Sequence, residues 1–346
     1  MADGGARQRT AYIGSITGAG GPGVLAAAVD PGSGALTPRG AAGGVPDPSY
    51  LALSPDGRML YAVSETSDGA VAAYRVDGGA PRLTGPPVPV GGVAASHLSV
   101  HAGHVLTANY GSGSVTAVPL RPDGTLASSR SGVLLHGGSG PHPERQRGPH
   151  VHQVLPDPSG RWLTGVDLGT DTVRVYTLAH GRPARHAVCR LRPGTGPRHL
   201  AFHPGGGYAY VLHELAPVVT VCRWDAATGS LRPLGETPVL PDAPAKDAYP
   251  SGIAVSPDGR FVWTATRGPD TLSVFAVEVG GRRLRLAGTE PCGGRWPRAL
   301  TAAHGFLYVA HERSGDVTWF TPDPETGRPR RRGAIAVPGA SCVVVG

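Results

Sequence analysis

The sequence predicts an all-β protein, a seven-bladed β-propeller built from four-stranded antiparallel blades. Three observations predict this fold: many turn-forming residues, a turn-and-strand unit that repeats along the chain, and two chain ends that complement each other. Gly and Pro account for 53 and 35 of the 346 residues. Because Gly and Pro cost about 1 and 3 kcal/mol in a helix interior, this composition excludes long helical bundles. The recurring apolar segments favour regular β structure over disorder.

The repeating unit begins with a Gly-containing turn, continues with a short apolar run and ends in a strand of alternating polarity. The turn reads Ser-Pro-Asp-Gly-Arg at 54–58 and 256–260, and it recurs in altered form at 157–161 and 203–207. The apolar runs follow at 59–63, 162–166, 208–212 and 261–265. The alternating strands lie at 71–74, 115–118, 173–176, 219–222, 272–275 and 317–320. Alternation of this kind between Gly and Pro residues is typical of β-strands.

The alternating strands recur about every 49 residues, so the chain has room for about seven units. A four-stranded unit of that length cannot bury both of its faces alone, which favours a ring of blades forming one domain over residues 1–346. Residues 11–14 resemble the second strand of a blade without its first, and residues 342–345 resemble a first strand with nothing after it. We therefore expect the C-terminal strand to pair with the N-terminal blade and close the ring.

Several protein classes are excluded by the apolar runs and the cysteines. The longest apolar runs, such as 24–29, are far shorter than the roughly 20 residues of a membrane-spanning helix. The polar start of the chain lacks the apolar core of a signal peptide, so we expect a cytoplasmic protein. The four cysteines are widely scattered, which disfavours a disulfide framework or a cysteine zinc site and predicts buried thiols in strands. These cysteines are Cys189, Cys222, Cys292 and Cys342.

The chain carries a formal charge of +7, almost all of it from arginine, because Lys246 is the only lysine. Dense arginine clusters occur only at 282–285 and 328–332. Solvated faces of outer strands explain these clusters more simply than nucleic-acid binding does. We expect no nucleic-acid or membrane partner, and a monomer or a weak homodimer.

Residues ten positions after the turn proline should lie together at one mouth of the central channel, because they follow equivalent strands. They differ from blade to blade, which indicates either a functional ring or strand ends that are free to vary. With small gaps in the degenerate blades they are Ile16, Glu65, Tyr110, Leu168, Glu214, Arg267 and Glu312.

The starts of the innermost strands should lie at the same mouth, because neighbouring strands of a blade are antiparallel. They carry His97, His150, His152, Arg198, His199, Ser251 and Arg298. His150 and His152 should point to the same side of a strand. The two longest insertions, 136–149 and 238–250, lead into these strands and should overhang the mouth as a rim or partial lid. Converging Arg and His residues suit a small anionic substrate.

Five segments resemble the signature of the propeller lactonase family. The most specific is Gly-Thr-Gly-Pro-Arg-His at 194–199, followed by Tyr-Ala-Tyr-Val-Leu-His-Glu-Leu at 208–215. Pro-His-Val-His at 149–152, Ala-Asn-Tyr-Gly at 108–111 and Pro-Arg at 297–298 fit as well. The family includes bacterial 6-phosphogluconolactonases of propeller type and, more distantly, fungal carboxy-muconate lactonising enzymes, and the resemblance covers essentially the whole chain.

The resemblance implies a metal-independent site in the channel mouth, without a cofactor. By analogy, His152, Arg198, Glu214 and Arg267 match the positions proposed to act on the lactone. From the residues alone, His150 and His152 could begin a zinc site, but zinc needs at least a third protein ligand, and the sequence marks none. The residues expected to bind substrate are His150, His199, Arg298, Glu65, Tyr110 and Glu312.

The chain departs from the family pattern in three places. Ile16 stands near a frequent aromatic position, and His213 stands where Asn is usual. The pair His311 and Glu312 is more charged than expected. We expect these changes to alter the wall of the pocket.

Opening a lactone requires an activated water and a group that stabilises the oxyanion. A neutral imidazole can accept the proton of water near pH 7, and we assign this to His152, with His150 as runner-up. Arg198 and Arg267 would stabilise the oxyanion or hold a substrate carboxylate, or simply form ion pairs with Glu214 or Glu312. Glu214 would orient the His or an Arg, act as acid or base, or be structural.

Three functions remain open at this point. The first is hydrolysis of a small anionic or sugar-derived lactone. The second is a cofactor-free cyclase or isomerase of specialised metabolism using the same residues. The third is a non-catalytic interaction propeller, which would present an apolar patch in place of convergent charge.

Overall fold

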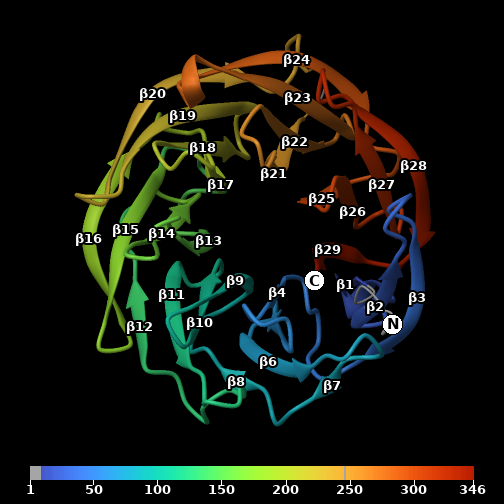
Figure 1. Cartoon of the computed structure of the whole chain (residues 1–346). Helices are drawn as coiled ribbons and strands as arrows, with labels where there is room; N and C mark the ends of the chain where they lie inside the picture. Colours follow the sequence, from blue (N-terminus) through green and yellow to red (C-terminus); the bar gives the residue numbers. More distant parts are fainter. Residues whose placement is uncertain (1–8, 245–246) are drawn as a thin grey trace, which may run out of the picture.

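The computed structural model describes residues 9–244 and 247–346 and shows seven antiparallel sheets arranged radially around one axis (Figure 1). Each sheet is one blade, and its strands lie side by side in order from the axis to the rim. The fold class expected from the repeat is therefore confirmed. Lys246 and the first eight residues, on which the expectation about a signal peptide rests, lie outside the described residues.

The first four blades contain the following strands, named from the axis outward. The first blade has β29 (Ala340–Val345), β1 (Thr10–Ser15), β2 (Val24–Val29) and β3 (Leu36–Ala42). The second has β4 (Leu51–Leu53), β5 (Met59–Ser64), β6 (Ala70–Arg75), β7 (Arg82–Leu83) and also β8 (Val88–Pro89) on β6. The third has β9 (Ala95–His101), β10 (His104–Asn109), β11 (Ser114–Pro119) and β12 (Gly132–Leu135). The fourth has β13 (Val151–Pro156), β14 (Leu163–Asp167), β15 (Thr172–Ala179) and β16 (Arg182–Arg190).

The remaining three blades follow the same order. The fifth has β17 (Pro197–Phe202), β18 (Tyr208–His213), β19 (Val218–Asp225) and β20 (Ser230–Pro238). The sixth has β21 (Tyr249–Val255), β22 (Phe261–Arg267), β23 (Thr271–Glu278) and β24 (Arg283–Pro291). The seventh has β25 (Pro297–Ala303), β26 (Phe306–His311), β27 (Asp316–Pro322) and β28 (Pro329–Ala336). The helical elements described are two short 3-10 turns, η1 (Thr17–Ala19) and η2 (Val279–Gly281).

The two ends of the chain meet in the first blade. The C-terminal strand β29 forms its innermost position and pairs with β1, with Ala11 opposite Val345 and Gly14 opposite Cys342. The pairing confirms the closure expected from the sequence. It gives β1 a partner on both sides and leaves no open edge between the last and first blades.

The core lies between blades, because each blade packs a neighbour on both faces. The second strands are therefore buried along their whole length, as β5 and β26 show, whereas the outermost strand β28 alternates with solvent. One cluster joins Tyr12 of the first blade to Leu60 and Tyr74 of the second. Contacts of this kind fix each blade relative to the next one.

The recurring turn has a local cause. The hydroxyl of Ser54 donates to Asp56 at 2.5 Å and accepts from the amide of Met59 at 2.9 Å. Gly57 has a φ of +68°, a left-handed conformation that glycine adopts without strain. The same arrangement recurs from Ser256 to Phe261, so the turn repeats because the first and second strands always need the same reversal.

Two further expectations were correct and one needs a small correction. The arginines of 282–285 and 328–332 are exposed on or beside the outer strands β24 and β28, where some pair with Glu278 and Asp323. All four cysteines are buried and free. Cys292, however, follows β24 instead of lying in a strand. No helix in the described part of the chain is long and apolar enough to cross a membrane.

Candidate active site

In six blades, a β-bulge near the start of the innermost strand places one extra residue at the axis. In a bulge, two residues on one strand oppose one on its partner, and the strand re-aims a side chain. In the fifth blade, Pro197 pairs with His213 and His199 with Leu212, so Arg198 is the extra residue. The same irregularity recurs in five other blades and marks Ser341, Ser96, His152, Ser251 and Arg298.

The paired residues of β4 and β5 show no such bulge, but Ser49 stands between Pro48 and Tyr50 as Arg198 stands between Pro197 and His199. Six of these seven residues line one small cavity, which shows that they converge. The cavity residues from this set are Ser49, Ser96, His152, Arg198, Arg298 and Ser341. The fold thus brings together His152, Arg198 and Arg298, which the sequence singled out.

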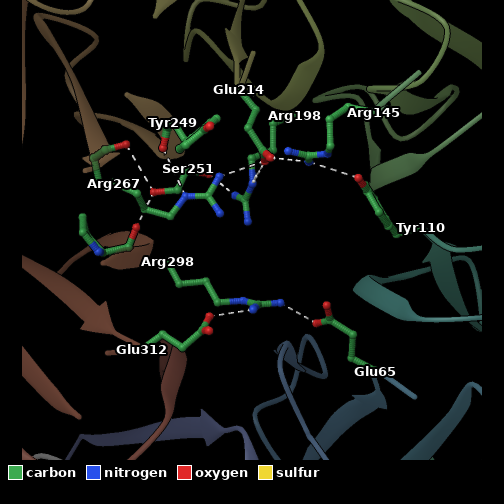
Figure 2. Close-up of polar contacts among 12 residues, drawn as sticks. Glu65, Tyr110, Arg145, Arg198, Glu214, Tyr249, Ser251, Arg267, Arg298 and Glu312 are labelled. Atoms are coloured by element: carbon green, nitrogen blue, oxygen red, sulfur yellow. Dashed lines mark hydrogen bonds and ion pairs between the residues drawn. The ribbon is translucent and has the colours of Figure 1, made fainter. Parts of the chain in front are cut away.

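A single carboxylate, Glu214, holds three arginines beside this ring (Figure 2). Its Oε2 lies 3.0 Å from Nε of Arg198 and 2.9 Å from Nη2 of Arg267. Its Oε1 lies 2.6 Å from Nη2 of Arg145. Arg198 also donates to the carbonyl of Ser251, and Arg267 donates to the carbonyl of Tyr249 at 3.1 Å. Each guanidinium is therefore fixed by more than one acceptor.

The electrostatics of this cluster favour the ionised carboxylate. Burial raises the pKa of Glu214, but the charges of Arg267, Arg198 and Arg145 outweigh burial and lower this pKa to about 2. Burial, followed by the charge of Arg267, lowers the pKa of Arg198 to about 9, although Glu214 opposes that shift. At neutral pH Glu214 is a fixed anion, so a role as a proton-donating acid is not supported by its surroundings.

Arg298 forms a second ionic group at the same mouth (Figure 2). Its Nη1 lies 2.7 Å from Glu312, and its Nη2 lies 2.6 Å from Glu65. Burial lowers the pKa of Arg298, but the two carboxylates outweigh burial and raise it above its ordinary value. The sequence left open whether Arg198 and Arg267 pair with Glu214 or with Glu312. Both pair with Glu214, and Glu312 pairs with Arg298.

Three buried histidines form a row along the inner wall. The ring of His152 lies 5.1 Å from that of His199, which lies 5.6 Å from that of His97. Tyr50 packs on His97 with ring centroids 4.1 Å apart. Burial, and then the charge of Arg198, hold the pKa values of His152 and His199 well below their ordinary value, and the same causes lower that of His97 to about 3. All three imidazoles are therefore neutral near pH 7.

The two histidines of the 149–152 segment do not follow simple strand alternation. β13 begins at Val151, so His150 precedes it, and His152 is the bulge residue. Both nevertheless contact the ring of Tyr110. His150 stacks on that ring at 4.5 Å and bonds the Tyr110 carbonyl through Nδ1 at 2.9 Å, whereas His152 meets the ring edge-on at 5.5 Å.

The insertion at 136–149 brings Arg145 into the site, as the expectation of a rim suggests. Nη2 of Arg145 also bonds the Tyr110 hydroxyl at 3.1 Å. The insertion is anchored at its start by His136, whose Nδ1 lies 2.6 Å from Asp167 and whose Nε2 bonds the Tyr176 hydroxyl. The second insertion contributes the carbonyl of Tyr249 to Arg267.

Sequence reasoning missed Arg145, because insertions have no equivalent in other blades. It also missed Ser49, Ser96 and Ser341, although each stands at the start of an innermost strand. Aligning the residue after Ala or Pro at these starts would have found Ser49 and Ser96 beside Arg198. Trp296 was missed as well: it has a φ of +63°, and the guanidinium carbons of Arg267 and Arg313 lie 5.5 and 3.4 Å from its ring centroid.

The expectation that three departures alter the pocket wall is wrong for two histidines. His213 is buried, and its Nε2 lies 2.7 Å from the Thr220 hydroxyl on the adjacent strand β19. His311 is also buried, with its Nδ1 3.5 Å from Asp316 on β27. Both side chains lie within their own blades, because they end the second strands before the residue that faces the mouth.

Two members of the expected mouth ring carry no polar chemistry. Leu168 is buried, and its carbonyl accepts a hydrogen bond from Gln146 of the rim insertion. Ile16 is half-buried and its amide bonds the carbonyl of Gly339. Among residues 9–244 and 247–346, no group of three or more His, Cys, Asp or Glu side chains is arranged to hold a metal ion.

The seven-bladed ring is the fold that the resemblance to propeller lactonases implies. The family model described as "Lactonase, 7-bladed beta-propeller" matches residues 10–345. The chain therefore belongs to this lactonase family, as the sequence resemblance indicates.

The chain is similar along its whole length to proteins named as lactonases. It is 34% identical to the 6-phosphogluconolactonase of Bacillus subtilis strain 168, over 96% of this chain and 97% of that protein. A putative 6-phosphogluconolactonase from Bacteroides fragilis superposes with a TM-score of 0.92 at 27% identity, covering 100% of both chains. The periplasmic gluconolactonase PpgL of Pseudomonas aeruginosa superposes with a TM-score of 0.90 at 30% identity, covering 97% of this chain and 98% of that one.

Proposed function

We propose that the protein hydrolyses a small anionic or sugar-derived lactone, of the kind acted on by a 6-phosphogluconolactonase, at the mouth of the central channel. The observation that supports this most is the position of the neutral, buried His152 beside the buried Arg198, where both line one cavity. A base and a cation side by side are what attack of water on an ester carbonyl requires.

In the proposed reaction, Nδ1 of His152 accepts a proton from water as the water oxygen bonds to the lactone carbonyl carbon. This nitrogen has no hydrogen-bond partner among the described residues. Negative charge develops on the carbonyl oxygen, and Arg198 stabilises it. When the ring carbon–oxygen bond breaks, the imidazolium returns its proton to the leaving alkoxide. The product is a hydroxy acid, and atoms and charge balance without a cofactor.

The other charged groups would bind and orient the substrate. Arg145 and Arg267 face the mouth on one side and suit a phosphate or carboxylate through their forked donors. Glu65 and Glu312 lie on either side of Arg298 and suit sugar hydroxyls, because a carboxylate accepts two hydrogen bonds at once. Among the exposed large apolar residues of the described chain, Val133, Leu135 and Val188 lie on outer strands, whereas Val93 lies in the loop that leads into β9. One exposed valine is not an apolar patch, so the mouth favours small-molecule chemistry over protein docking.

The direct test is turnover of 6-phosphogluconolactone and gluconolactone in water labelled with heavy oxygen. We expect one labelled oxygen in the carboxylate of the product, at a rate well above spontaneous hydrolysis. Incorporation separates hydrolysis from cyclisation or isomerisation, which take no oxygen from solvent. Turnover without label would support the cyclase reading, and no turnover of any lactone in a panel would contradict the proposal.

The role of His152 predicts the effect of His152→Asn. We expect kcat/KM to fall by about 10²-fold or more, the usual contribution of a general base. Since His152 has a lowered pKa, its neutral form persists below pH 6.5. Activity on an uncharged gluconolactone should therefore change less than about twofold between about pH 7.5 and 6, where a base of ordinary pKa would lose about fourfold.

The exposed His180 provides a matched control, because His180→Asn removes an imidazole far from the site without altering the mouth. We expect it to retain wild-type activity. Retention of wild-type kcat/KM by His152→Asn as well would remove His152 from the reaction and turn attention to His150.

A further inference from the structure

The small cavity lined by His152 and Arg198 has the properties of an anion site that is present before substrate binds. It has a volume of about 10 Å³, which is about what one water molecule needs, so it can hold only a single small ligand. Five of its nine lining residues are bulge residues of five blades, and Ser49 is the equivalent residue of the second blade. The others are Tyr50, His199 and Ala299. It therefore lies where the blades converge, and its walls are held by the whole ring.

Several polar atoms on the walls of this cavity have no partner within the described residues. They are the hydroxyls of Ser49 and Ser96, Nδ1 of His152 and Nε2 of His199. All four residues are more than nine-tenths buried, with exposed fractions of 2% and 5% for the two serines and 8% and 7% for the two histidines. A buried hydroxyl without a partner is unfavourable, so a ligand that accepts hydrogen bonds would satisfy the two serine hydroxyls.

The charge around the cavity is positive. Its lining includes Arg198 and Arg298 and contains no Asp or Glu. The acids that pair with these arginines, Glu214 and the pair Glu65 and Glu312, stand outside the lining. The ion pairs of the surrounding mouth have a net charge of +1. They contain four arginines, Arg145, Arg198, Arg267 and Arg298, and three glutamates, Glu65, Glu214 and Glu312.

The shifted titration of the neighbouring groups agrees with this positive field. The charge of Arg198 adds to burial in lowering the pKa of both His152 and His199. The charges of Arg267 and Arg298 add to burial in lowering the pKa of Arg198 itself. An anion in the cavity would lie against these groups and offset their mutual repulsion, which a neutral water molecule cannot do.

We propose that this cavity binds a monovalent monatomic anion of the chloride class, held by the hydroxyls of Ser49 and Ser96 and by the field of Arg198 and Arg298. His152 and Arg198 line this same cavity in the proposed reaction, but anion binding needs no substrate, because the donors and charges are present without one. The hydroxyl of Ser341 also lines the cavity, but it donates to the carbonyl of Gly14 at 2.9 Å and is a weaker candidate ligand.

Bromide provides the probe, because it scatters anomalously and resembles chloride in size and charge. In crystals of the full chain soaked in sodium bromide, we expect an anomalous difference peak inside the cavity. In solution, we expect the protein to broaden the chloride-35 resonance, and we expect added bromide to reverse this broadening by displacing bound chloride. A cavity filled by a water molecule, with no anomalous peak and no excess broadening, would overturn the proposal.

Variants assign the effect to this cavity. Ser49→Ala combined with Ser96→Ala removes two donors, and we expect chloride affinity to fall by about tenfold or more. Ser99→Ala is the matched control: Ser99 lies on β9 as Ser96 does, and its buried hydroxyl also has no partner among the described residues, but it does not line the cavity. Equal affinity in the double variant and the control would also overturn the proposal, whether or not the protein hydrolyses lactones.

Discussion

Replacing Arg198 by methionine is expected to reduce kcat/KM on a lactone by about 10²–10³-fold, the usual loss when one oxyanion donor is removed. The same change should alter the free energy of unfolding by no more than about 1 kcal/mol, because methionine fills similar volume and the site disfavours the charge it removes. The lowered pKa of Arg198 indicates that the site disfavours its charge, because burial and the charge of Arg267 both destabilise the protonated form. A residue kept against its own stability is expected where function requires it.

Arg145→Met is the matched control for this prediction, because Arg145 binds the same carboxylate from the rim. Its side chain is 35% exposed, and Glu214 keeps two other partners when it is lost. We expect a rise in KM for an anionic lactone of about tenfold or less, and little change in kcat. Steady-state kinetics and urea unfolding of both variants measure the two effects. If Arg198→Met matched Arg145→Met in kcat, Arg198 would be a binding residue only.

The repeat predicts the blades well because every blade solves the same packing problem. The turn at 54–58 recurs at 256–260 because each reverses the chain between a first and a second strand. The second strands are buried on both faces, so they are read directly as apolar runs. Closure of the ring by residues 342–345 could be predicted for a similar reason. Each chain end carries an incomplete blade, and only the other end can complete it.

The site is harder to predict because it depends on departures from that repeat. Arg198 and Glu214 are near each other in sequence, and their convergence could be expected from the register of β17 and β18. Arg145 is 69 residues from Glu214 in an insertion that no other blade has. The bulge that directs Ser96, His152 and Arg198 to one cavity leaves no mark in composition, because Ser, His and Arg satisfy the same backbone position.

Glutamine in place of Glu214 should produce the largest loss of stability of any single change at the mouth. The variant leaves Arg145, Arg198 and Arg267 close together without their common anion. Breaking a buried ion pair by removing one partner costs about 3–5 kcal/mol. We expect a loss of this size in the free energy of unfolding, measured by urea denaturation at neutral pH. Glu312→Gln is the control, because Arg298 keeps Glu65 and the groups are partly exposed, so its cost should stay near or below about 1 kcal/mol.

The pH dependence of this loss follows from the lowered pKa of Glu214. A carboxyl whose pKa is lower in the folded state stabilises the fold above its ordinary pKa and stops doing so as pH falls through the folded value. The difference between wild type and Glu214→Gln should therefore be full above about pH 4.5 and shrink toward about pH 2. A difference that stayed constant across this range would mean that the loss comes from packing and that the three arginines do not depend on the charge of Glu214.

Combining Glu214→Gln with Arg198→Met tests the same interaction from both sides. Glu214→Gln alone leaves three uncompensated positive charges, whereas the double variant leaves two, one of them partly exposed. We expect the double variant to be more stable than Glu214→Gln alone, with a coupling energy of about 1–3 kcal/mol, as for directly contacting residues. Additive effects would show that Arg198 and Glu214 act independently despite their 3.0 Å separation. If the two changes are coupled in stability and each variant loses turnover, the role of Glu214 is to hold Arg198 at the axis. Without that carboxylate, burial of the Arg198 charge would be unfavourable.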